Sequence, residues 1–299
     1  MSILMLIAAF GSGAFATAIG GVESFILTGV FAIVGTCLGL AGAGDAGAFV
    51  TGNVAFGMFG PHIAFAGAVA GAAYAKKAGK LDNGADIITP VSSCNDPMAL
   101  IVGGIFGAGG YLFKALLVDN VFAGTISTKL VTDGPGFTVF CSAIIARLVF
   151  GGSIKTGDAI KSEGAAWTTC ITLGATYSLM TAGFMVGAIS LFPDYTDAIL
   201  GNWPVLCFGI AAVGLTFACG GLAFYGCHQI LLISALAAAK AYPSMGAGGA
   251  LVAGVIFGVI AAIINDSETV FMNSGTVSHI DGPATAIFIS TFIINAIWG

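Results

Sequence analysis

Long apolar runs follow one another along this sequence from end to end, and most of them are long enough to cross a bilayer. Crossing the hydrocarbon core takes roughly 20 apolar residues. Only 8% of the 299 residues are charged, whereas a soluble globular chain carries about 25% charged residues. These properties predict an all-α polytopic membrane protein embedded in the lipid bilayer, without a soluble catalytic domain.

Further properties of the sequence refine this prediction. The 46 glycines favour close packing of transmembrane helices, because small residues let helix backbones approach each other in lipid. The formal charge of −5 is carried by so few residues that we expect no nucleic-acid partner. The seven cysteines show no CxxC spacing and are interpreted as buried packing thiols. The apolar start of the chain lacks a basic region, which predicts a retained helix.

The first half of the sequence recurs in the second half. Three blocks match in the same order: 59–62 with 225–228, 99–107 with 250–258, and 131–151 with 279–299. Internal repeats of this kind define the architecture of many carriers. We therefore interpret residues 1–152 as transmembrane repeat 1, 153–165 as a cytoplasmic linker, and 166–299 as transmembrane repeat 2.

Each repeat contains about five apolar spans, which makes about ten transmembrane helices. The expected spans are 1–20, 24–43, 46–75, 98–118 and 136–154, then 166–192, 199–217, 219–241, 247–265 and 283–299. Because the number per repeat is odd, the second repeat enters the membrane inverted relative to the first.

Lysines set the expected orientation. Positive residues accumulate on the cytoplasmic side of a membrane protein. The lysines after spans three and five would lie on one side of the membrane, whereas the 192–197 loop on the other side carries only acidic charge. We expect the lysine side to be cytoplasmic and both termini to lie outside. Lys129 and Lys240 do not follow this rule.

The third span of each repeat is predicted to be broken. Gly57, Gly60 and Pro61 interrupt the first, since proline removes a helical hydrogen bond and glycine permits an unwound turn. The repeat places Gly226 at the position of Gly60. Non-helical backbone at membrane depth is tolerated only where protein covers it or where it lines a cavity, so we expect a substrate site beside both glycines.

His62 and His228 occupy equivalent positions in the two repeats. In an inverted pair, equivalent positions approach each other near the midplane, so the two imidazoles are candidates for lining one path. Histidine inside a bilayer is often functional because it is polar and titrates near neutrality. The alternative is a histidine that only hydrogen-bonds to a neighbouring helix. Asn53 is a further polar candidate, which would either bind solute or bridge two helices.

A DGP motif begins the last span of each repeat, at Asp133 and Asp281. Aspartate at the N-cap followed by proline in the first turn is favourable helix-start chemistry. The alternative interpretation is a cation site, to which Ser142 and Ser290 would add oxygens. Preceding hydroxyl groups would contribute as well, at Thr125, Ser127, Thr128, Thr132, Thr276 and Ser278.

Arg147 is a basic residue within an apolar span. It would either neutralise an anionic substrate or an acid, or extend its charge to the cytoplasmic surface. We favour the second interpretation because Arg147 lies about one helical turn from the end of its span.

The segment DGPATAIF, from Asp281 to Phe288, and its counterpart at Asp133 resemble a motif in the membrane-embedded beta subunits of sodium-translocating decarboxylases. The resemblance covers about 15 residues in each half. It implies that an aspartate of this kind takes part in sodium handling within inverted five-helix repeats. The paired histidines are also similar to those of ammonium channels, and the five-span plan to that of urea channels. The longer motifs of these two families are absent from the sequence.

Together these features predict a secondary transporter or channel of the cell membrane. It would move a small polar solute or ion through a site at the repeat interface, with coupling to sodium or protons. The alternative is an ion-conducting or anchoring subunit of a larger enzyme complex, against which the short loops argue. We expect no enzymatic activity, because the sequence has no HExxH, GxSxG or catalytic acid pair. Apart from sodium we expect no cofactor, and the plan is compatible with a homo-oligomer.

Overall fold

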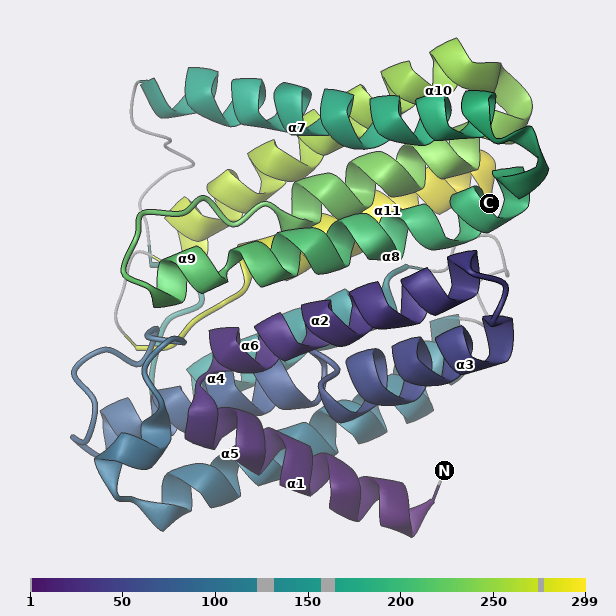
Figure 1. Ribbon diagram of the computed structural model, residues 1–299. Coiled ribbons are helices and arrows are strands. Elements are labelled where there is room, and N and C mark those ends of the chain that lie inside the picture. Colours follow the sequence, from purple (N-terminus) through teal and green to yellow (C-terminus); the bar gives the residue numbers. More distant parts are fainter. Residues whose placement is uncertain (1, 123–131, 157–164, 274–276) are drawn as a thin grey trace.

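Helices make up most of the chain in the computed structural model, which describes residues 2–122, 132–156, 165–273 and 277–299 (Figure 1). No strand occurs within these ranges. The elements of the first half are α1 (Ile3–Ile19), α2 (Gly21–Leu40), α3 (Gly44–Phe49), η1 (Val50–Met58), α4 (Ala64–Lys77), η2 (Val91–Cys94), α5 (Pro97–Phe113), η3 (Lys114–Phe122) and α6 (Gly134–Phe150). Those of the second half are α7 (Ala165–Leu191), η4 (Pro193–Tyr195), α8 (Thr196–Gly214), α9 (Thr216–Cys219), α10 (His228–Met272) and α11 (Gly282–Trp298).

Five helical segments are long and apolar enough to cross a membrane: Gly21–Leu40, Pro97–Asp119, Trp167–Leu191, Pro193–Cys219 and His228–Met272. The apolar helices α1, α6 and α11 are shorter. Large apolar side chains point outward, including Ile3 and Leu191, each 75% exposed. A water-soluble surface rarely presents so many large apolar groups, so these helices indicate a membrane protein. The predicted all-helical fold class is confirmed.

The predicted break in the third span of the first half is present. The helical path through α3 and η1 ends at Met58, and α4 begins only at Ala64. In the second half, residues 220–227 between α9 and α10 are not helical. Helix α10 itself bends at Gly246, whose φ of 64° and ψ of −172° are not helical. It therefore consists of two arms, 228–245 and 247–272, where the sequence predicted two separate spans.

Each half contains a close crossing of three helical segments. In the first half, α1, α4 and α5 meet around Gly67, where a β-carbon would lie 2.6 Å from both the carbonyl oxygen of Gly103 and the Cα of Gly13. In the second half, α7 meets both arms of α10, and a β-carbon at Gly254 would lie 2.6 Å from the Cβ of Ala182. The small residues thus allow the close helix packing that the composition predicted.

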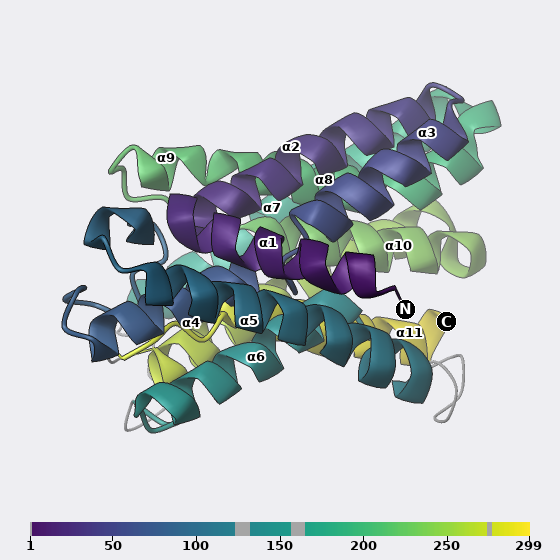
Figure 2. The same cartoon turned by 90° about the horizontal axis from the view of Figure 1, so that it is seen from below.

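Two helix pairs join the halves. Helix α2 packs against α8, and α6 packs against α11; α2 and α8 lie side by side in Figures 1 and 2. A β-carbon at Gly29 of α2 would lie 2.7 Å from the Cβ of Ala212 in α8. Between α6 and α11, the rings of Phe137 and Phe288 are arranged edge to face, with their centroids 5.3 Å apart. The space between these two pairs contains the cavity described next.

Candidate functional site

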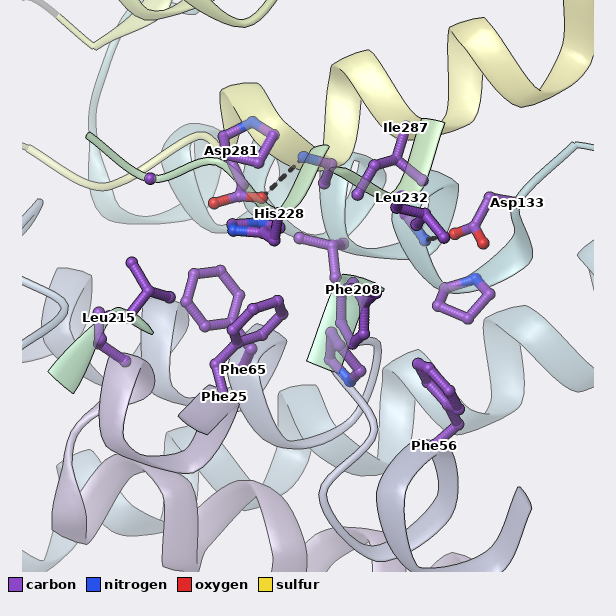
Figure 3. A pocket seen from close by; sticks show the side chains of 18 of the residues that line it. Phe25, Phe56, Phe65, Asp133, Phe208, Leu215, His228, Leu232, Asp281 and Ile287 are labelled. Carbon is purple, nitrogen blue, oxygen red and sulfur yellow. Dashed lines mark hydrogen bonds between the residues drawn. The ribbon is translucent and has the colours of Figure 1, made fainter. Parts of the chain in front are cut away.

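A cavity of about 360 Å³ lies between the two halves, and we call it the central cavity. Its walls come from α2, η1, the turn before α4, α4 itself, α6, α8, α10 and α11, and from the segments between them. Figure 3 shows two carboxylates on the side of α6 and α11, facing a group of phenylalanine rings. The lining residues labelled there are Phe25, Phe56, Phe65, Asp133, Phe208, Leu215, His228, Leu232, Asp281 and Ile287.

Both DGP aspartates line this cavity and cap a helix. The Oδ1 of Asp133 accepts a hydrogen bond from the backbone N–H of Gly136 at 2.6 Å. The Oδ2 of Asp281 accepts one from the backbone N–H of Ala284 at 2.8 Å. The N-cap interpretation of the two motifs is therefore confirmed. The same geometry also places both carboxylates in the cavity wall, so capping and ligand binding do not exclude each other.

His228 lies in the wall of the central cavity and is only 6% exposed. Its ring centroid lies 4.7 Å from that of Phe25 and 6.1 Å from that of Phe208. Its Nδ1 is buried and has no hydrogen-bond partner in the part of the chain that the structure describes. The imidazole also interacts electrostatically with Asp281. His228 is thus a buried polar group between an acid and an aromatic cluster.

His62 does not line the central cavity. It is 4% exposed and lies in the wall of a second cavity with Asn53 and Lys114, which we call the His62 cavity. The two cavities are adjacent, because Phe56 and Pro135 belong to the walls of both. The structure therefore brings the two histidines to neighbouring cavities and not to a single one.

A third cavity meets the central cavity at Asp133. Its wall contains Lys240 and Gly299, and we call it the Lys240 cavity. Asp133, Val205 and Leu232 line both cavities. Asp133 therefore lies between the central cavity and the Lys240 cavity.

The other predicted substrate residues have different surroundings. Gly226 lines the central cavity. Gly60 is buried in the turn before α4, where a β-carbon would lie 2.9 Å from the Cε1 of His62. Asn53 is exposed and lines the His62 cavity.

The predicted serine ligands lie apart from the aspartates. Ser142 and Ser290 each follow their aspartate by nine residues, about 13 Å along a helix axis. Both are buried in helix packing and line none of these three cavities. Of the preceding hydroxyls, Thr132 donates a hydrogen bond to the carbonyl oxygen of Phe288 at 2.5 Å. Thr125, Ser127, Thr128 and Thr276 lie outside the described residues.

The interpretation that Arg147 extends to the surface is wrong. Its side chain is fully buried at 0% exposure. The guanidinium donates hydrogen bonds to the hydroxyl of Ser278 at 2.5 Å and to its carbonyl oxygen at 2.6 Å. It also donates to the carbonyl oxygens of Ser153 and Met272, both at 3.0 Å. The position of Arg147 near the end of its span predicted contact with water, but Ser153, Met272 and Ser278 surround its guanidinium.

Two chemically important residues were missed from the sequence. His279 lines the central cavity, and its Nε2 lies 3.0 Å from the Oδ1 of Asp281. Glu268 is 6% exposed and lies beyond the predicted end of its span. A β-carbon at Gly282 would lie 2.7 Å from the Oε2 of Glu268 and 2.8 Å from the Oδ1 of Asn265. The position of His279 two residues before Asp281 could have predicted that the two side chains interact. The location of Glu268 beside Gly282 depends on tertiary packing and could not be predicted in this way.

A lysine lies beside the first DGP motif and is paired with an acid. Lys114 forms an ion pair with Asp119 at 2.9 Å, and a β-carbon at Gly134 would lie 3.4 Å from the Cε of Lys114. The two DGP segments are thus alike in their caps but differ in the charge beside them.

The segment between α4 and α5 contributes Ile87 to the central cavity. The carbonyl oxygen of Ile87 accepts a hydrogen bond from Val22 at 2.9 Å. Nearby, burial alone would raise the pKa of Asp86, but hydrogen bonds from the Thr89 hydroxyl and from the backbone N–H groups of Thr89 and Ile88 lower this pKa below its usual value. The ionised Asp86 therefore stabilises the turn that positions Ile87.

Comparison with known proteins adds a family assignment. The model of one family, described as a family of unknown function (DUF7973), matches residues 1–164 and 166–298. No curated protein and no solved structure shows a significant match to the chain. Because the matched stretches include almost every residue, the chain belongs to the family of unknown function DUF7973.

Proposed function

We propose that this chain is a multi-pass transport protein of the cell membrane, either a secondary transporter or a channel. It moves a small polar solute or ion through the interface between two inverted repeats of five spans each. Sodium or protons are the coupling ions. The protein works without enzymatic chemistry.

The position of Asp133 carries this proposal. The Lys240 cavity extends to Gly299 at the C-terminus, whereas the central cavity extends to Ile87 in the segment between α4 and α5. These two regions are at opposite ends of the helices in Figure 1. Asp133 belongs to the walls of both cavities. Ionisable groups inside membrane spans are costly and commonly mark ion and substrate pathways.

Several observations support the inverted-repeat plan. Under the proposed duplication, α2 corresponds to α8 and α6 to α11, and both pairs are in contact. Helices α2 and α8 run in opposite directions in Figure 1. Both DGP motifs make the same N-cap bond. The two stretches that match the family model also divide at residue 165, the end of the proposed linker.

The surroundings of Asp281 support ion coupling. Glu268 and Asn265 present oxygen atoms beside Gly282, the residue after Asp281. The Oε1 of Glu268 is buried and has no hydrogen-bond partner within the described ranges. The other oxygen, Oε2, accepts a hydrogen bond from the Asn273 amide at 3.4 Å, and the carboxylate interacts electrostatically with Arg147. Hard cations take oxygen ligands, and a buried oxygen that no donor contacts is costly. A sodium ion or a proton at this group would satisfy it.

Flux measurements in proteoliposomes test the proposal. The purified chain is reconstituted, and uptake of sodium, small carboxylates, urea and ammonium is compared with protein-free vesicles. We expect at least one solute to pass faster with protein present. Replacing both histidines, His62→Asn with His228→Asn, should abolish that flux while the melting temperature in detergent stays close to that of the wild type.

A capping aspartate outside the cavities provides the control. The Asp96 carboxylate caps α5 by accepting from the Met98 N–H at 2.9 Å, so Asp96→Asn should leave the flux unchanged. Wild-type flux in the double histidine variant would show that these residues do not form part of the path. Absence of flux for every solute would contradict the transport proposal itself.

A further inference from the structure

The side of the central cavity that faces the two carboxylates is aromatic. The ring centroid of Phe25 lies 5.9 Å from that of Phe65 and 5.4 Å from that of Phe208, and both pairs are arranged edge to face. The ring centroids of Phe208 and Phe56 are 5.6 Å apart. The four rings therefore form one connected surface, drawn below the carboxylates in Figure 3. Such rings offer a negative face to a cation but no oxygen ligands for a bare metal ion.

The charged groups of the wall are of one sign. Asp133 and Asp281 line the central cavity, and among its lining residues in the described part of the chain there is no lysine or arginine. The N-termini of α6 and α11 would attract anions, but each is already capped by its own aspartate. An anionic solute would therefore find no free positive partner except an imidazole.

Asp133 has an oxygen available for a ligand. Its Oδ1 caps α6, and the structure shows no hydrogen bond to its Oδ2 from the described residues. Lys114 interacts electrostatically with Asp133, but its ammonium group is paired with Asp119 at 2.9 Å and faces the His62 cavity. Asp281 differs, because its oxygens bind His279 and Ala284. The carboxylate oxygen that remains available for a ligand is therefore on the Asp133 side.

We infer that the central cavity binds a small organic cation, an amine with an apolar body, whose charge is held between the Asp133 carboxylate and the rings of Phe56 and Phe208. This inference rests on the proposed transport function and names its substrate class. The cavity volume of about 360 Å³ falls within the range of small-molecule sites. The Nδ1 of His228 in the same wall is buried and has no hydrogen-bond partner in the described chain, so it offers a further polar atom to a ligand.

Three probes of the same shape but different charge test the inference. They are choline, its uncharged carbon analogue 3,3-dimethylbutan-1-ol, and the anion 3,3-dimethylbutanoate. Binding to the purified chain is measured by isothermal titration calorimetry in detergent. We expect choline to bind about thirtyfold more tightly than the alcohol, the effect of one partly buried charge pair, and the anion not to bind. Equal binding of the alcohol, tighter binding of the anion, or no binding of choline would overturn the inference.

Two variants locate the charge. Asn is as good an N-cap as Asp, so Asp133→Asn removes the charge and keeps the start of α6. We expect this variant to lose the preference for choline over the alcohol, whereas Asp96→Asn, the matched cap outside the cavity, should retain it. Phe208→Leu provides a second test if Asp133→Asn does not fold. Loss of the ring should weaken choline binding about fivefold with little change for the alcohol. An unchanged preference in the folded variants would contradict the site.

Flux of the same probes separates this inference from the transport proposal. If proteoliposomes pass the alcohol or the anion faster than protein-free vesicles but not choline, the substrate class is wrong and transport remains. If choline binds with the expected preference but neither the three probes nor sodium, small carboxylates, urea or ammonium pass, the binding site is supported and the transport proposal fails.

Discussion

The guanidinium of Arg147 in α6 donates hydrogen bonds to both the hydroxyl and the carbonyl oxygen of Ser278, three residues before the Asp281 cap. This contact joins the end of the first half to the segment that begins α11. Glu268 also interacts electrostatically with the same guanidinium. A single buried cation therefore holds together the backbone on one side of the central cavity.

Loss of Arg147 should destabilise the protein. Arg147→Met would leave the carbonyl oxygens of Ser153, Met272 and Ser278 without their donor and Glu268 without its cation. Because unpaired buried polar groups are costly, we expect a loss of about 3 kcal/mol or more, measured as a lower melting temperature in detergent. Lys77→Met is the control, since Lys77 is exposed and its ammonium group contacts the Val149 carbonyl oxygen and the Phe150 ring at the surface. Equal effects of the two changes would contradict a structural role specific to Arg147.

Sodium should stabilise the folded protein through the group around Asp281. A ligand that binds only the native state at a hundred times its Kd adds about 2.7 kcal/mol of stability. We expect the melting temperature to rise when potassium chloride is replaced by sodium chloride at constant ionic strength. The rise should be absent in Asp281→Asn and present in Asp96→Asn. Identical melting in the two salts would argue against sodium as the coupling ion.

Glycine at the crossing of α1, α4 and α5 should be required for tight packing. In Gly67→Ala the added methyl group would lie 2.6 Å from the Gly103 carbonyl oxygen and the Gly13 Cα, so the helices would have to separate. Overpacking of this kind costs about 1–3 kcal/mol. Gly109→Ala in α5 meets nothing within 4 Å and should be neutral or slightly stabilising. Thermal unfolding of both variants measures the difference, and a neutral Gly67→Ala would show that the crossing tolerates expansion.

The orientation in the membrane can be tested with single cysteines. The segment between α4 and α5 and the turn between α7 and α8 are at opposite ends of the helices in Figure 1. Lys80 and Asp194 are exposed residues of these two segments. On a cysteine-free background, a membrane-impermeant maleimide should label Asp194→Cys in intact cells and Lys80→Cys only after permeabilisation, because positive loops stay cytoplasmic. The reverse pattern would invert the proposed topology.

Local features were predictable from the sequence because they depend on neighbouring residues. The apolar runs predicted the helices, Gly60 and Pro61 predicted the break before α4, and the DGP motifs predicted the N-caps of α6 and α11. The break and the caps depend on backbone hydrogen bonding within a few residues. These features required no knowledge of which helix packs against which.

Which side chains share a cavity was decided only by the tertiary structure. His62 and His228 have equivalent sequence positions, yet they line different cavities. Arg147 lies near a helix end, yet a segment more than a hundred residues away covers it. The physical reason is that helix crossings set by small residues place distant segments together. The sequence by itself determined that this chain is helical and where α6 and α11 begin. The packing of α2 on α8 and of α6 on α11 determined that Asp133 faces a cavity lined with phenylalanine.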